Sequence, residues 1–144
     1  MVKTPQPAAD LGRLLARLET DGAGAVLVRV GRTRGSVPRE SGTWMAVCHD
    51  EVIGTIGGGS LEWQAIAQAR EALRLGAALP PVQTVALGPS LGQCCGGRLE
   101  LVFERVGAGD AAALRQRLAA SLRPLGLFGG GHVGRAIVQA LAPL

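Results

Sequence analysis

VIGTIGGGSLEWQAIAQAREALRLG, residues 52–76, is the stretch that decides the fold, because three consecutive glycines separate an apolar, β-branched run from a longer helical one. The first run predicts a strand, and the second predicts a helix of about four turns at roughly 3.6 residues per turn. Gly76, followed by Pro80 and Pro81, marks the end of that helix. A strand, a glycine turn and a helix in succession favour a layered α/β domain.

The sequence before this stretch predicts one helix and two strands. A leucine stripe in DLGRLLARLETDG (10–22) is typical of an amphipathic helix, with Asp10 as its expected N-cap. Apolar runs at residues 25–33 and 43–48 predict strands. We expect the second of these to form a hairpin with the strand that begins the deciding stretch.

The sequence after it continues the alternation. Residues 81–87 and 98–106 predict strands, and GDAAALRQRLAASLRP (109–124) predicts a helix capped by Asp110. Because strands and helices alternate, we expect an α/β domain with a mixed sheet over residues 1–123. Residues 124–144 then predict a strand, a glycine turn and a helix, the incomplete start of a Rossmann-like domain.

Composition narrows the class of protein. The chain has 144 residues, 47% hydrophobic and 18% charged, which suits a globular domain with a real core. No apolar run approaches the roughly 20 residues of a membrane span, and the first residues lack the apolar core of a signal peptide. The net charge of +4 comes with no basic helix or aromatic platform, so nucleic acid is not the expected partner. We expect a cytoplasmic protein.

The three glycines are also a candidate anion site. They leave the first N–H groups of the following helix unpaired, with the positive end of the helix dipole behind them. A phosphate would suit such a turn, so Gly57, Gly58, Gly59, Ser60 and Glu62 are candidate binding residues. A turn that only redirects the chain is an equally good explanation, in which Ser60 caps the helix and Glu62 stabilises its dipole.

GRTRGSVPRESG (31–42) is a second candidate for an anionic ligand. Ser36 offers a hydroxyl, and Arg39 offers a planar set of N–H donors suited to an oxyanion. Taken alone, an ordinary hairpin connection with exposed arginines is the simpler explanation.

GPSLGQCCGG (88–97) places two of only three cysteines side by side between glycines. It has no C-x-x-C spacing and no neighbouring histidine, so neither a zinc site nor a cysteine-protease dyad is indicated. Cys94 and Cys95, beside the amide of Gln93, remain as thiols able to approach a soft metal centre or carry sulfur. Cys48 lies in an apolar run, where we expect a small buried side chain.

FGGGHVGRA (128–136) carries Gly129, Gly131 and Gly134 at the G-x-G-x-x-G spacing of dinucleotide-binding folds. The sequence stops before the acidic residue expected about 20 positions later, which would hold a ribose. We therefore expect an incomplete nucleotide site, in a piece of a longer protein or in a motif that has lost its role.

The motifs together resemble the XdhC/CoxF family of xanthine dehydrogenase accessory proteins, over nearly the whole chain. They occur in the order GSVPRESGTWMAV (35–47), GTIGGGSLE (54–62), LGPSLGQCCGG (87–97) and LFGGGHVGRA (127–136).

The resemblance implies an XdhC-type domain followed by the start of a Rossmann domain, and a maturation chaperone rather than an enzyme. Such a protein binds molybdenum cofactor, holds it during sulfuration and delivers it to xanthine dehydrogenase or a related molybdenum hydroxylase. The implied partners include a cysteine desulfurase and a second copy of the chain, without nucleic acid or membrane. NAD(P) is implied only for a complete C-terminal domain.

From the glycine turn and the adjacent thiols we hypothesise that residues 57–60 hold the cofactor phosphate, with Arg39 as a second donor, and that Cys94 and Cys95 approach its metal. Two other classes stay open. One is an NAD(P)-dependent oxidoreductase with a redox-active cysteine pair, and the other is a cofactor-free adaptor that docks its target enzyme.

Overall fold

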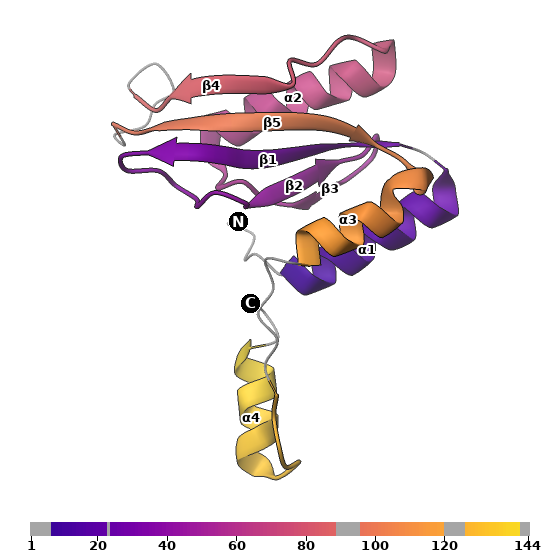
Figure 1. The fold of residues 1–144 in the computed structure, drawn as a ribbon, viewed down its shortest axis with the longest axis vertical. Helices are drawn as coiled ribbons and strands as arrows, with labels where there is room; N and C mark the ends of the chain where they lie inside the picture. The colour runs from indigo at the N-terminus through magenta and orange to yellow at the C-terminus, as the bar shows by residue number, and fades with distance from the viewer. Residues whose placement is uncertain (1–6, 23, 89–95, 120–125, 142–144) are drawn as a thin grey trace.

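The computed structural model describes residues 7–22, 24–88, 96–119 and 126–141. These residues form a five-stranded sheet with helices packed against it (Figure 1). The elements, in chain order, are α1 (Pro7–Asp21), β1 (Ala25–Arg34), β2 (Trp44–Val47), β3 (Val52–Gly54), α2 (Gly59–Leu75), β4 (Val82–Ala86), β5 (Arg98–Val106), the short 3-10 helix η2 (Ala108–Asp110), α3 (Ala111–Ala119) and α4 (His132–Leu141).

The sheet has the order β3-β2-β1-β5-β4, and every neighbouring pair is antiparallel. The prediction of a mixed sheet is therefore wrong. Alternation of strands and helices suggested parallel β-α-β units, but α2 joins β3 to β4, which lie at opposite edges of the sheet. The expected hairpin is confirmed, since β2 and β3 pair from Met45 with Gly54 to Val47 with Val52.

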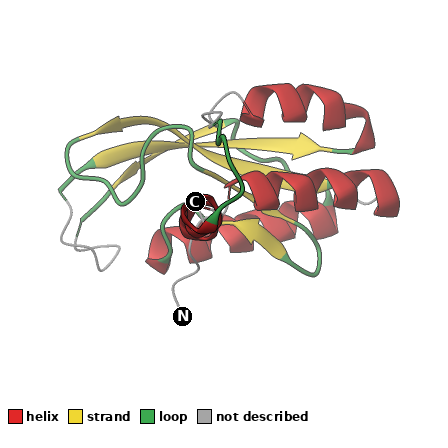
Figure 2. Ribbon diagram, turned by 90° about the horizontal axis from the view of Figure 1, so that it is seen from below, coloured by secondary structure: helices red, strands yellow, loops and turns green. Residues whose placement is uncertain are grey.

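The two faces of the sheet pack against different helices, so the domain has three layers. Successive residues of a strand point to opposite faces, and β1 divides its side chains in this way. Leu27 belongs to the cluster formed with α1 and α3, whereas Val26 and Val28 belong to the cluster formed with α2. Figure 2 shows the arrangement from below, with helices on both sides of the strands.

Two helix boundaries differ from the sequence prediction, and one agrees. α1 begins at Pro7, so Asp10 lies inside its first turn and is not its N-cap. Proline is well tolerated at the first helical position, which explains the earlier start. Asp110 ends η2 instead of capping α3 directly, and its carboxylate accepts a hydrogen bond from the Gly107 N–H at 2.8 Å. α2 ends at Leu75 and is capped by Gly76, which adopts the left-handed conformation expected of a glycine at a helix end.

The C-terminal residues form only part of the predicted pattern. α4 is present, but residues 126–130 form no strand, because a strand needs a neighbour to bond with and this segment pairs with none of the five described strands. α4 lies away from the sheet in Figure 1, and Phe128 before it is fully exposed. No helix among the described residues is long and apolar enough to cross a membrane.

Candidate functional site

Residues 35–42, here called the Arg39 loop, connect β1 to β2 and contact two of the other motifs. One contact is at Gly97, the last residue of segment 88–97, here called the cysteine loop, of which residues 89–95 lie outside the described part of the chain. A Cβ added to Gly97 would overlap the carbonyl oxygen of Ser36, and one added to Gly35 would lie 3.2 Å from the Gly97 α-carbon. The Leu87 N–H donates to the Gly97 carbonyl at 2.8 Å, which closes the base of the cysteine loop. That base therefore lies directly against the Arg39 loop.

The second contact is with the glycine turn, residues 57–59. A Cβ on Gly57 would lie 3.1 Å from Arg39 Cγ and 3.2 Å from Pro38 Cβ, and Gly57 has a φ of 123°. Only glycine combines that backbone conformation with so close an approach. The turn thus supports the side of the loop that carries Arg39.

Glu62 satisfies the donors on the inner side of the glycine turn. Its Oε2 accepts hydrogen bonds from the Thr55 hydroxyl at 2.5 Å, the Ile56 N–H at 2.8 Å and the Gly58 N–H at 3.1 Å. The chain therefore supplies its own carboxylate to these groups. α2 begins at Gly59, and the N–H groups of its first turn have no acceptor within the helix. These N–H groups remain as donors for another anion.

A cavity of about 630 Å³ lies between the Arg39 loop and the first turn of α1. Its walls come from both of these segments and from the β2–β3 hairpin. The lining residues are Pro7, Asp10, Val37, Pro38, Arg39, Glu40, Ser41, Gly42, Thr43, Trp44, Gly54 and Thr55. This volume is within the range of roughly 300–1,000 Å³ that small-molecule sites occupy.

The cavity brings together charged groups of opposite sign. Arg39 Nε is buried and has no hydrogen-bond partner in the part of the chain that the structure describes. Buried donors are nearly always paired, so an unpaired guanidinium N–H at a cavity wall points to a missing acceptor. Asp10 reaches the same cavity from α1 and is only 6% exposed.

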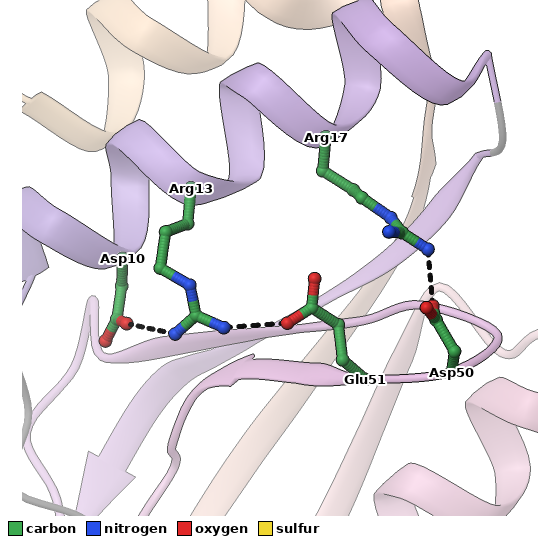
Figure 3. A network of polar contacts seen from close by, with 5 residues as sticks. All are labelled: Asp10, Arg13, Arg17, Asp50 and Glu51. Atoms are coloured by element: carbon green, nitrogen blue, oxygen red, sulfur yellow. Dashed lines mark hydrogen bonds and ion pairs between the residues drawn. The ribbon is translucent and has the colours of Figure 1, made fainter.

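Ion pairs hold α1 against the β2–β3 turn beside the cavity (Figure 3). Arg13 bonds to Glu51 at 2.7 Å and lies 3.7 Å from the Asp10 carboxylate, and Arg17 pairs with Asp50. The pKa of Asp50 is lowered, first by a hydrogen bond from its own backbone N–H and then by Arg17. These pairs fix the side of α1 that carries Asp10.

The remaining site predictions have different outcomes. Ser36 is exposed, and its backbone contacts Gly97. Gln93, Cys94 and Cys95 lie outside the described residues. The buried position of Cys48 is confirmed, at 3% exposure. Among the described residues, no three His, Cys, Asp or Glu side chains are grouped so as to hold a metal ion.

The C-terminal glycines form a separate feature. A Cβ on Gly134 would press against the Gly129 carbonyl oxygen, and Gly129 has a φ of 103°. Gly131 accepts the backbone N–H of Arg135 at 3.1 Å, which starts α4. A second cavity, of about 300 Å³, adjoins this turn and shares no lining residue with the Arg39 cavity.

Sequence reasoning missed two participants, and the reasons differ. Asp10 was expected to cap a helix, and no sequence pattern indicates that it faces the Arg39 loop, 29 positions later. Glu62 was expected to act on the helix dipole or on a ligand, whereas it bonds to the turn itself. Glu62 lies four residues after Gly58, within the first turn of α2, and this spacing could have indicated that its carboxylate bonds to the turn.

Comparisons with known proteins agree with the motifs. A model described as the XdhC and CoxI family matches residues 18–84. A protein of Escherichia coli strain K12, described as the uncharacterized protein YqeB, is 30% identical over 131 residues, which are 90% of this chain and 22% of that protein. The chain thus spans less than a quarter of the curated relative that it matches.

A crystal structure described as a xanthine dehydrogenase from Bacillus halodurans has a TM-score of 0.60 and 23% sequence identity, over 77% of this chain and 34% of that one. At this identity the likeness concerns the fold. The family match covers residues 18–84, which include both the Arg39 loop and the glycine turn. Residues 18–84, which run from the end of α1 into β4, are therefore similar to the XdhC and CoxI family.

Proposed function

We propose that this chain is an accessory protein for molybdenum hydroxylases of the xanthine dehydrogenase type, and that it binds molybdenum cofactor and delivers it to the enzyme. The family supports the accessory role. The observation that carries the cofactor assignment is the position of the Arg39 loop. It contacts the base of the cysteine loop at Gly97 and the glycine turn at Gly57, and it lines the cavity.

The chemistry of the described residues fits this cargo. Molybdenum cofactor is a pterin with a phosphate at one end and a sulfur-bound metal at the other. The unpaired Arg39 Nε offers a charged donor for the phosphate, and charged hydrogen bonds are roughly twice as strong as neutral ones. N–H groups at the start of α2 are further donors. Cys94 and Cys95 are the proposed contacts of the metal end, with Gln93 beside them.

The first experiment is cofactor loading. The protein is purified anaerobically under reducing conditions from cells that make molybdenum cofactor, and its molybdenum is measured together with pterin fluorescence after oxidation. Co-purification of both would support the carrier. If neither is present and the protein still captures a cofactor-free molybdenum hydroxylase, it is an adaptor.

The second experiment concerns the thiols. Replacement of Cys94 and Cys95 by serine should lower molybdenum retention, because thiolates are soft ligands and hydroxyls are not. Cys48→Ser is the matched control, since Cys48 is buried in the core cluster beside α1. Unchanged retention in the double variant would remove the thiols from the proposal.

A further inference from the structure

Asp10 is buried, and within the described residues its carboxylate accepts no hydrogen bond that explains the burial. It lies in the first turn of α1, is 6% exposed and lines the cavity opposite the Arg39 loop. Burial of a carboxylate is costly unless it is paired and hydrogen-bonded. Within the described residues, its ion pair is with Arg13 at 3.7 Å, beyond hydrogen-bond distance, while Arg13 is engaged at 2.7 Å by Glu51.

The cavity therefore presents an acceptor from one element and a donor from another. Asp10 offers two carboxylate oxygens, and Arg39 offers a buried, unpaired Nε–H. Trp44, 7% exposed, adds an apolar surface to the same cavity. Glu40 also lines the cavity, but it is exposed, so its charge is well solvated.

Each of these groups selects a chemical feature of a ligand. A carboxylate pairs with two parallel N–H donors, as it does with a guanidinium. A 2-amino-4-oxopyrimidine ring presents such a pair through its amino group and the adjacent ring N–H. A guanidinium selects an oxyanion such as a phosphate.

We infer that Asp10 binds the aminopyrimidine edge of a pterin in the Arg39 cavity, while Arg39 binds the anionic group of the same ligand. This inference rests on the proposed function for the identity of the ligand. It adds a recognition residue from α1, an element outside the glycine and cysteine motifs. It also assigns the phosphate to Arg39 in preference to the glycine turn. The inner N–H donors of that turn already bond to Glu62.

The test uses two free ring compounds without metal or phosphate. They are a pterin, and the corresponding lumazine, which has a carbonyl in place of the 2-amino group. Wild-type protein should bind the pterin about tenfold or more tightly than the lumazine, because the lumazine lacks one donor for Asp10. Asp10→Asn should bind the pterin about tenfold or more weakly than wild type. Glu19→Gln, which removes an exposed carboxylate of α1 that does not line the cavity, should bind it as wild type does.

The anionic end is tested by competition with inorganic phosphate against a phosphorylated pterin. Phosphate should displace the phosphorylated pterin from the wild type, and this displacement should be lost in Arg39→Gln. Arg34→Gln is the control, because Arg34 is exposed and does not line the cavity, and phosphate should displace the ligand from it as from the wild type. Circular dichroism of each variant establishes that it is folded. The pterin and lumazine comparison needs only the wild-type protein, so misfolding of a variant does not remove the test.

Equal binding of pterin and lumazine by the wild type, or unchanged pterin binding in Asp10→Asn, would overturn the inference. The outcome is separate from that of the chaperone proposal. Pterin selectivity through Asp10 in a protein that purifies without molybdenum would keep the inference and reject the carrier. Full loading of Asp10→Asn with molybdenum cofactor would reject the inference about Asp10 and keep the carrier proposal.

Discussion

Gly97 lies so close to Ser36 that any side chain at position 97 would overlap the Ser36 carbonyl oxygen. This contact joins the end of the cysteine loop to the Arg39 loop, although 61 positions separate the two residues in sequence. A glycine is needed here because of the backbone approach. The contact places the end of the cysteine motif against the arginine motif, although the two are remote in the sequence.

Gly97→Ala should therefore destabilise the fold, by about 1–3 kcal/mol, the usual cost of forcing extra atoms into a packed site. Gly96→Ala is the matched control, because a Cβ at Gly96 would meet nothing within 4 Å. Urea denaturation of the two variants measures the difference. Equal free energies of unfolding would show that the contact is not tight in solution.

Gly57→Ala should both destabilise the protein and weaken phosphate competition, since its methyl group would press on Arg39 Cγ and Pro38. Gly58→Ala separates the two effects. Gly58 also has a positive φ, of 77°, but has open space around it, so its variant should show only backbone strain of about 1 kcal/mol or more. Binding losses of equal size in both variants would contradict the proposed support of Arg39 by Gly57.

Glu62→Ala should lower the free energy of unfolding by about 1–3 kcal/mol for each buried donor left unpaired. The buried donors are the Ile56 N–H and the Thr55 hydroxyl, and the partly buried Gly58 N–H loses its acceptor as well. Glu71→Ala, an exposed position on the same helix, should have little effect. If inorganic phosphate restored the stability of Glu62→Ala, the turn would be a true anion site that Glu62 normally fills.

Asp50 should make stability depend on pH in acid. Its folded pKa is lowered below the ordinary 3.8 by its own backbone N–H and by Arg17. The unfolded chain then binds the proton more readily, so this stabilisation is present above pH 3.8 and is lost as the pH falls through the lowered pKa. Urea midpoints of wild type and Asp50→Asn should converge over that interval. A difference that stayed constant with pH would contradict the assignment.

Local sequence patterns predicted most of the elements but not their pairing. The leucine stripe of α1, the β2–β3 hairpin and the end of α2 at Gly76 depend on residues close in sequence, and all three are confirmed. The antiparallel pairing of β1 with β5 joins Val28 to Phe103, and no local pattern encodes a partner so far away. The expectation of a mixed sheet came from the alternation of strands and helices, which does not determine how the strands pair.

The sequence predicted part of the candidate site, because the glycine motifs are local patterns. Glycines marked the places where the backbone turns or is approached closely, as Gly57 and Gly97 show. Sequence could not say what approaches them, because that depends on how β1, β3 and β5 are placed in the sheet. Asp10 enters the cavity only through the packing of α1 against the hairpin.

The measurement that tests the central claim most directly is the amount of molybdenum and oxidised pterin that purifies with wild type, Arg39→Gln and Arg34→Gln under identical anaerobic conditions. We predict near-stoichiometric cofactor in the wild type and in Arg34→Gln, and a large loss in Arg39→Gln. Equal loading of the two arginine variants, or a wild-type protein with neither molybdenum nor pterin, would contradict the account.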